Sequence, residues 1–101
     1  SQEKQKPQSQ EVSDADGLMD IFRRLGQYRA GDPAAPEAQA LIGELQQYIC
    51  DHYYNCTKQI LFGLGQMYAD GGSMTENIDN AGGAGTGAFA RQAIEVYCKA
   101  E

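Results

Sequence analysis

The sequence predicts an all-α domain, and two observations carry that prediction. Apolar residues recur at three- and four-residue steps through most of the chain, as they do on one face of a helix. No stretch shows the strict alternation of apolar and polar residues that is typical of a half-buried strand. We therefore expect a small helical domain with four main helices and one short helix.

Start and stop signals set the first two helices. Ser13 or Asp14 is expected to cap the first helix, and Gly31-Asp32-Pro33 is expected to end it. The second begins near Pro36, because proline lacks only an N–H that has no partner in a first helical turn. It ends within residues 52–55 unless its period runs on into the third helix. The two apolar faces consist of Leu18, Ile21, Phe22, Leu25 and Tyr28, and of Leu41, Ile42, Leu45, Tyr48 and Ile49.

The remaining helices follow the same period. The third ends at the Asp70-Gly71-Gly72 turn, and a short helix is expected from Thr75 to Asp79, capped by Ser73 or Thr75. A flexible glycine-rich tract, residues 81–87, precedes the last helix. The apolar positions of the third and last helices are Ile60, Leu61, Leu64, Met67 and Tyr68, and Phe89, Ala93, Ile94 and Tyr97.

The beginning of the chain has a different composition. Residues 1–14 contain one apolar side chain, Val12, among Gln, Lys, Glu and Ser. Such a segment buries too little apolar surface to offset its ordering entropy, so we expect a disordered linker there and a folded domain over residues 15–101. Because the chain starts at Ser1, with no initiator Met and no apolar signal segment, we expect a piece of a longer protein.

Charge and cysteine content exclude several classes of protein. The net charge is −6, and the basic residues form no cluster beyond the Arg23–Arg24 pair, so the domain is not expected to bind nucleic acid by itself. No apolar run approaches the roughly 18 residues of a membrane span. Three cysteines, an odd number without framework spacing, indicate a reducing, cytoplasmic compartment.

Cys50, His52 and Cys56 form a C-x-H-x₃-C pattern that invites a metal-site interpretation. On a helix, positions two and six residues further on are rotated by about 200° and 240°, so the three side chains cannot converge on one ion. A structural zinc site also needs four ligands, and only Cys98 is left to complete the set. We therefore expect no metal and no cofactor.

Two further patterns bear on catalysis and nucleotide binding, and neither is complete. His52 and Cys56 are four residues apart and would share a helix face, but no residue is nominated to orient the imidazole or to form an oxyanion hole. The glycine-rich residues 82–87 follow no strand and precede no Lys, unlike a phosphate-binding loop. A binding protein is favoured over an enzyme, with a small cysteine-dependent enzyme as an alternative.

The most informative stretch is His52–Tyr68, HYYNCTKQILFGLGQMY. It combines four aromatic rings with two glycines, a thiol and a methionine. Large rings beside Gly63 and Gly65 favour a cleft over a close-packed core, and Tyr and Met suit adaptable ligand clefts. A plain core is the alternative, because an apolar stripe at helical spacing is normally buried.

Four short motifs follow one another along the second half of the chain. They are H-Y-x-x-C from His52 to Cys56, G-L-G-Q-M-Y from Gly63 to Tyr68, T-E-N-I-D from Thr75 to Asp79, and A-F-A-R-Q-A-I from Ala88 to Ile94. In this order and spacing they resemble the TipAS antibiotic-recognition domain, over about residues 37–99. The resemblance implies an all-α, globin-like fold without haem and a cleft for bulky ligands such as thiopeptide antibiotics.

The resemblance also implies a wider context. TipAS domains are C-terminal effector modules of MerR-type transcription activators, so DNA binding and dimerisation would belong to a part outside this chain. The full-length protein is then expected to be a homodimer and this fragment a monomer. Some family members hold the effector through a cysteine thioether, and Gly63 stands at the position that we match to that cysteine. We expect Cys56, near a helix start, to be the most reactive thiol without being an obligate covalent anchor.

We therefore expect a regulatory ligand-binding domain with a cleft between the Tyr53–Tyr68 helix, the first helix and the last helix. A bulky hydrophobic molecule would bind there and order the N-terminal region. The alternative is a protein-interaction module that uses the same aromatic face. Gly63 is expected in the cleft floor. The residues expected to bind the ligand are Tyr53, Cys56, Phe62, Gly63, Met67, Tyr68, Phe22 and Phe89.

Overall fold

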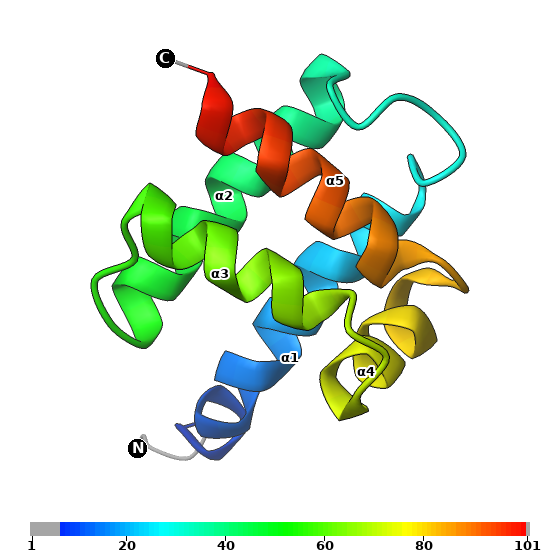
Figure 1. Cartoon of the computed structure of the whole chain (residues 1–101). Coiled ribbons are helices and arrows are strands. Elements are labelled where there is room, and N and C mark those ends of the chain that lie inside the picture. Colours follow the sequence, from blue (N-terminus) through cyan, green and yellow to red (C-terminus); the bar gives the residue numbers. More distant parts are fainter. Residues whose placement is uncertain (1–6, 101) are drawn as a thin grey trace.

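The computed structural model describes the backbone of residues 7–100 and the side chains of residues 14–100. This part of the chain contains five helices and no strand (Figure 1). The helices are α1 (Pro7–Gly26), α2 (Pro36–His52), α3 (Lys58–Tyr68), α4 (Ser73–Gly82) and α5 (Thr86–Lys99). The predicted all-α fold of four main helices and one short one is confirmed, and α4 is the shortest.

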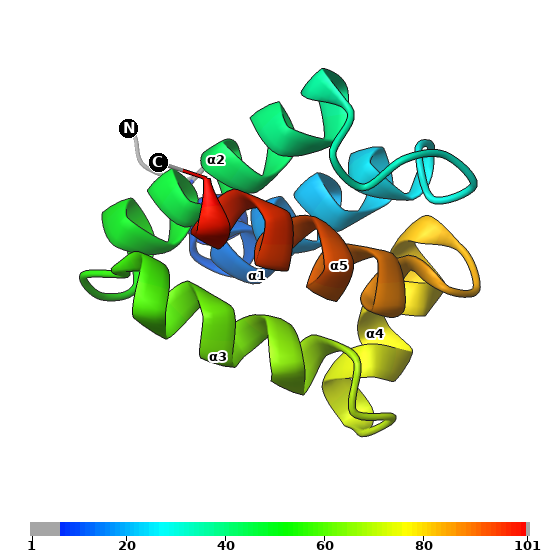
Figure 2. The ribbon, with the colours of Figure 1, turned by 45° about the horizontal axis from the view of Figure 1, so that its top comes forward.

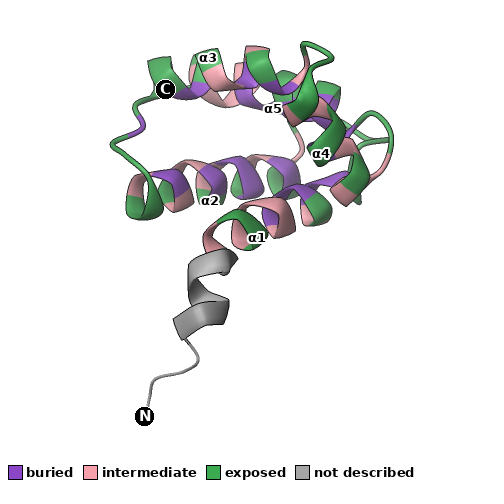
Figure 3. Cartoon of the chain, turned by 90° about the horizontal axis from the view of Figure 1, so that it is seen from below, coloured by how far each residue is buried: buried purple, intermediate pink, exposed green. Residues whose placement is uncertain are grey.

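The helices pack around one core. α3 lies along α5, while α1 contacts both α2 and α4 (Figure 2). Seen from below, α3 and α5 form one layer, α1 and α2 form the other, and α4 lies at one end (Figure 3). This arrangement is compatible with the expected globin-like packing. The largest fully buried apolar side chains are Tyr68, Phe22, Leu25, Ile42, Leu45, Leu61, Ile78 and Ile94.

No helix in the described part of the chain is both long and apolar enough to cross a bilayer.

The start of α1 differs from the prediction. The helix begins at Pro7 rather than at Ser13 or Asp14, and proline suits a first turn because its missing N–H would have no helical partner there. Residues 7–14, which we expected within a disordered linker, are therefore helical, and residues 1–6 lie outside the described residues. Composition alone misplaced this boundary, because a polar segment can extend a helix whose later turns are held by packing.

The end of α1 is set by packing and not by the expected Gly31 break. Gly26 lies so close to the backbone of Gly82 on α4 that a side chain on Gly26 would collide with it. The chain turns away at this crossing, and Arg29 fixes the turn by donating to the carbonyls of Gly26 (2.7 Å) and Gly82 (2.9 Å). Tyr28, expected on the apolar face, is exposed because the helix ends before it.

The helical period does not continue from α2 into α3. α2 ends at His52, residues 53–57 form a loop, and α3 begins at Lys58. Thr57 caps α3, since its hydroxyl oxygen accepts a hydrogen bond from the backbone N–H of Ile60 (3.2 Å). The aromatic-rich stretch is thus a helix end, a loop and a second helix.

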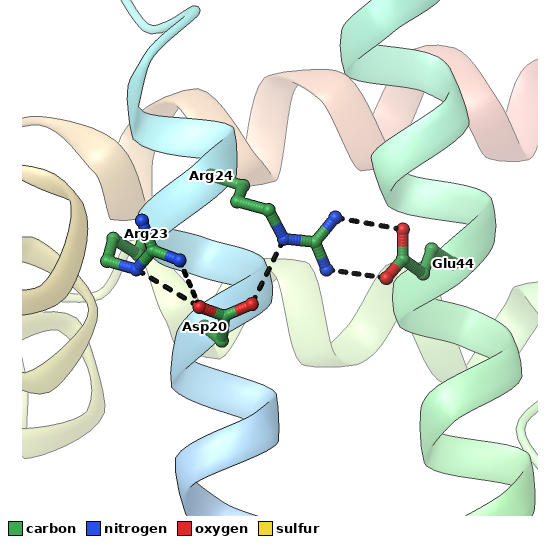
Figure 4. A network of polar contacts seen from close by, with 4 residues as sticks. All are labelled: Asp20, Arg23, Arg24 and Glu44. Carbon is green, nitrogen blue, oxygen red and sulfur yellow. Dashed lines mark hydrogen bonds and ion pairs between the residues drawn. The ribbon is translucent and has the colours of Figure 1, made fainter.

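Arg23 and Arg24, the basic pair noted in the sequence, both contact carboxylates (Figure 4). Arg24 donates from Nη2 and Nη1 to the two oxygens of Glu44 on α2, at 2.5 and 3.2 Å, and from Nε to Asp20 at 3.1 Å. The Arg23 guanidinium lowers the pKa of Asp20, and the Arg24 guanidinium lowers the pKa of Glu44. This network joins α1 to α2.

Candidate ligand-binding hollow

A hollow of about 210 Å³ opens between α1, the end of α2 and its following loop, α3 and α4. We call it the aromatic hollow, because three tyrosines line it. Apart from their hydroxyl groups, its side chains are apolar. The lining residues are Leu18, Ile49, Tyr53, Tyr54, Leu64, Met67, Tyr68 and Met74.

α3 supplies one wall of the aromatic hollow. Met67 and Tyr68 lie three and four residues after Leu64, so both are neighbours of Leu64 on one side of the helix. Both ends of α3 are fixed: Thr57 caps its start, and the Thr75 hydroxyl donates to the carbonyl of Tyr68 at its end (2.8 Å). The wall is therefore held on a regular helix rather than on a mobile segment.

The α2–α3 loop supplies the rim. The backbone N–H groups of Tyr53 and Tyr54 both donate to the carbonyl of Ile49 (2.9 and 3.1 Å), which places the two rings at the mouth of the hollow. Their exposed fractions are 46% and 50%. The far end of the loop is pinned by Gln46, which donates from Nε2 to the carbonyl of Cys56 (2.8 Å).

Tyr68 combines deep burial with a polar group. Its ring packs edge-on against Phe22, with centroids 5.1 Å apart and planes at 79°. Burial raises the pKa of Tyr68 above its ordinary value. Within the described residues its hydroxyl forms no hydrogen bond, whereas buried polar groups are normally paired. Tyr68 thus brings both a ring and a hydrogen-bond donor to the wall residues of the hollow.

A set of contacts that we call the Asp14 anchor connects the rim to α1. The Tyr48 hydroxyl donates to the carbonyl of Asp14 (2.6 Å), and the Asp14 carboxylate contacts His52 Nδ1 (3.1 Å). The Tyr48 and His52 rings stack with centroids 4.1 Å apart. Tyr53 lies next to this stack, 6.4 Å from the Tyr48 ring. The rim of the hollow and the first half of α1 are thus in contact through Tyr48.

The structure brings together three of the eight predicted site residues. Tyr53, Met67 and Tyr68 line the aromatic hollow, and Phe22 supports it from behind through Tyr68. Phe89 on α5 is buried in the core and does not line the hollow. The expected wall from the last helix is in fact supplied by α4.

Phe62 and Gly63 do not lie in the hollow. Phe62 is exposed on another side of α3. Gly63 is exposed as well, and a Cβ built on it would meet no atom within 4 Å. The prediction that Gly63 forms the cleft floor is therefore wrong, and it is not a helix crossing either. Gly65 is the packed glycine, since its Cβ would lie 3.2 Å from the Ile94 side chain.

Cys56 also differs from its prediction. Its side chain is 2% exposed, and burial raises its pKa, so the expected preference for thiolate at a helix start is absent. Its backbone N–H donates to the sulfur of Cys50 (3.2 Å). Among the described residues, no group of three or more Cys, His, Asp or Glu side chains is placed to hold a metal ion.

Sequence reasoning missed five lining residues. Three of them, Leu18, Ile49 and Leu64, were assigned to core stripes, and in the structure they lie where a core stripe meets the hollow. Tyr54 was noted with the aromatic face but not assigned to the site. Met74 had no sequence signal, because its position depends on how α4 packs against α1.

The family model of the TipAS antibiotic-recognition domain matches residues 1–97. The HTH-type transcriptional activator mta of Bacillus subtilis (strain 168) is 38% identical over 78 residues, which are 77% of this chain and 30% of that protein. The chain thus spans less than a third of the length of this curated relative. No solved structure matches the chain.

Proposed function

The chain belongs to the TipAS antibiotic-recognition domain family, and on this premise we propose that it is the effector-binding domain of a transcription activator. The proposed effector is a bulky, largely apolar small molecule, with thiopeptide-like antibiotics as the first class to test. DNA binding and homodimerisation are assigned to parts of the protein outside this chain, and the isolated domain is proposed to be monomeric and its location cytoplasmic.

The observation that carries the proposal is the aromatic hollow itself. Tyr53 and Tyr54 stand half-exposed at its mouth, and the flexible side chains of Met67 and Met74 line its sides. Tyrosine and methionine offer apolar area that adapts to different shapes, as promiscuous ligand sites require. A ligand in this hollow would bury the rings and could accept a hydrogen bond from the Tyr68 hydroxyl, which has no partner among residues 14–100.

The Asp14 anchor supplies a route from ligand to the rest of the protein. Tyr53 lies beside Tyr48, and Tyr48 holds the carbonyl of Asp14. A ligand that packs on Tyr53 would favour the state in which α1 is docked, because a ligand shifts an equilibrium by its difference in affinity for the two states. Coupled ordering typically costs about 2–5 kcal/mol, which several aromatic contacts would offset.

The same geometry argues against the cysteine-dependent enzyme. His52 contacts Asp14 and stacks on Tyr48, and no contact joins it to Cys56 within residues 14–100. The Cys56 thiol is buried and its pKa is raised, which is the opposite of an activated nucleophile. A binding role therefore fits these residues better than catalysis.

Ligand binding is tested with ¹⁵N-labelled protein and a panel of hydrophobic antibiotics that includes a thiopeptide. We expect a binder to shift the amide signals of Tyr53, Leu64 and Met67, and Tyr53→Ala to weaken binding at least about ten-fold, since a buried aromatic anchor is typically worth 2 kcal/mol or more. Tyr28→Ala is the matched control, because Tyr28 is an exposed tyrosine outside the hollow. Equal losses in the two variants would contradict the proposal.

The protein-interaction module remains a second candidate because of one observation. Ile60 and Phe62 are each 41% exposed on α3, and neither lines the hollow. The two residues are two positions apart and so lie on different sides of α3, and a partner helix would use Phe62 as an apolar anchor on its own side. If this function holds, Phe62→Ser in the full-length protein abolishes transcription activation and leaves antibiotic affinity unchanged. If the effector function holds, Phe62→Ser changes neither.

A further inference from the structure

A second hollow lies beside the aromatic hollow, between α1 and α4. Its volume is about 490 Å³, and we call it the α1–α4 hollow. Leu18 and Met74 line both hollows, so these two side chains form the partition between them. Met74 is half-buried and unbranched, and a methionine side chain changes rotamer at little cost. A turn of the Met74 side chain would widen the passage between the two hollows.

The α1–α4 hollow differs from its neighbour in its polar groups. Asn77 and Asn80, both on α4, line it, and their carboxamides form no hydrogen bond within the described residues. The two asparagines are three residues apart, so they share a helix face with about 5–6 Å between their Cβ atoms. Each carboxamide offers N–H donors and a carbonyl acceptor. An amide group of a ligand has the complementary acceptor and donor.

The charge and size of the two hollows narrow the chemical class of the ligand further. Among residues 14–100, no charged side chain lines either hollow, so a charged ligand would lose water without gaining an ionic partner there. The aromatic hollow alone is smaller than the range of about 300–1,000 Å³ that ligand pockets span, whereas the two hollows together lie within it. A bulky effector thus needs the second hollow.

We propose that the α1–α4 hollow is a second compartment of the effector site, which binds the neutral, amide-bearing end of an elongated ligand through Asn77 and Asn80. The apolar end of the same ligand occupies the aromatic hollow, and Met74 turns aside to let it pass. This inference rests on the proposed function and adds the chemical class of the ligand. It also gives α4 a direct role in recognition.

Three small probes with one phenylbutyl framework test the inference in ¹⁵N-labelled protein. They are butylbenzene, N-methyl-4-phenylbutanamide and the 4-phenylbutyl-trimethylammonium ion. We expect butylbenzene to shift only the amide signals around Tyr53 and Met67. We expect the amide probe to shift these signals and also the side-chain NH₂ signals of Asn77 and Asn80. The charged probe is expected to bind more weakly than the amide probe.

The double variant Asn77→Ala/Asn80→Ala adds a measurement of affinity. Both changes favour a helix, so the variant is expected to fold. Its affinity for the amide probe should fall about ten-fold, as expected for the loss of one or two hydrogen bonds, while its affinity for butylbenzene stays within about two-fold. Gln92→Ala, an exposed amide on α5 outside both hollows, is the matched control and should change neither affinity.

The outcomes separate this inference from the proposed function. Shifts at Tyr53 and Met67 without a response of Asn77 and Asn80, or equal affinities in the double variant, would overturn the second compartment alone. Tighter binding of the charged probe than of the amide probe would overturn the neutral ligand class. The absence of any shift at Tyr53 and Met67 with all three probes would contradict the proposed function and this inference with it.

Discussion

Two glycines of α3 have opposite surroundings, so substitutions at the two positions should change the free energy of unfolding in opposite directions. A Cβ on Gly63 would meet no atom within 4 Å, whereas one on Gly65 would lie 3.2 Å from Ile94 on α5. We expect Gly63→Ala to raise the free energy of unfolding by about 0.5–1 kcal/mol, because alanine favours a helix interior. Gly65→Leu should lower it by roughly 1–3 kcal/mol through overpacking. Urea unfolding measures both signs, and a destabilised Gly63→Ala would contradict the open position of Gly63.

The three thiols are expected to react in an order set by burial. Cys50 and Cys98 are half-buried and Cys56 is buried, and burial raises the pKa of both Cys56 and Cys98. Because the thiolate is the reactive form and needs access to the reagent, limited alkylation should label Cys50 and Cys98 first. Mass spectrometry of the digested protein measures the order. Labelling of Cys56 before both others in the folded protein would show that the α2–α3 loop opens.

Tyr68 gives a prediction on alkaline stability. Because burial raises its pKa in the folded state, the phenol stays protonated there while the unfolded chain ionises near the ordinary value of about 10. The contribution of Tyr68 to the free energy of unfolding is therefore fully present below about pH 10. It is lost as the pH rises from there toward the pKa of the folded state, by up to about 1.4 kcal/mol per pH unit.

The substitution Tyr68→Phe removes the ionisable hydroxyl and with it this loss of stability at high pH. The free energy of unfolding of the variant should fall less steeply above about pH 10 than that of the unsubstituted protein. At neutral pH the variant should be as stable or slightly more stable, since the hydroxyl has no partner within the described residues. Urea unfolding across the pH range checks this, and identical slopes for the two proteins would place the hydroxyl in contact with water.

At the scale of the helices, the Asp14 anchor is expected to hold the first half of α1. Tyr48→Phe removes the hydrogen bond from the Tyr48 hydroxyl to the carbonyl of Asp14. Hydrogen exchange over residues 14–20 should then become about three- to ten-fold faster, the loss expected for one hydrogen bond. Tyr97→Phe is the matched control, because it removes a tyrosine hydrogen bond to Gln46 between α5 and α2. Equal acceleration of α1 in both variants would mean that the effect is global.

The helices and their boundaries show which parts of the fold could be predicted from the sequence. The apolar period and the turn residues correctly predicted the all-α fold and where α2 begins, because these depend on local chemistry, but residues 7–14 were expected to be disordered and are helical. Both ends of α1 were misplaced. Its true end at Gly26 depends on the approach of Gly82, a residue far along the chain. Tertiary contacts of this kind override local stop signals.

At the scale of the whole molecule, the candidate site was predicted in part for the same reason. Tyr53, Met67 and Tyr68 belong to one continuous stretch of aromatic and flexible residues, so composition indicated them. Leu18 and Met74 lie on different helices and line the hollow only after α1 and α4 have packed together. Periodicity identifies which face of a helix is apolar, but it does not tell which part of that face remains uncovered.

The proposed function also predicts how a ligand changes the stability of the entire domain. A ligand that binds the folded state alone adds about 2.7 kcal/mol at a concentration one hundred times its Kd. For a domain of this size, each kcal/mol raises Tm by about 4–8 °C, so a true effector should raise Tm by roughly 10–20 °C. Differential scanning calorimetry at several ligand concentrations measures the shift.

Two variants tie that shift to the aromatic hollow. Tyr53→Ala removes a half-exposed ring from the rim, so its Tm without ligand should change little while the ligand-induced shift should shrink. Tyr28→Ala removes an exposed ring away from the hollow and should keep the full shift. If the ligand-induced shift is the same in Tyr53→Ala as in Tyr28→Ala, the ligand binds elsewhere on the domain, because stabilisation by mass action follows the affinity of the occupied site alone.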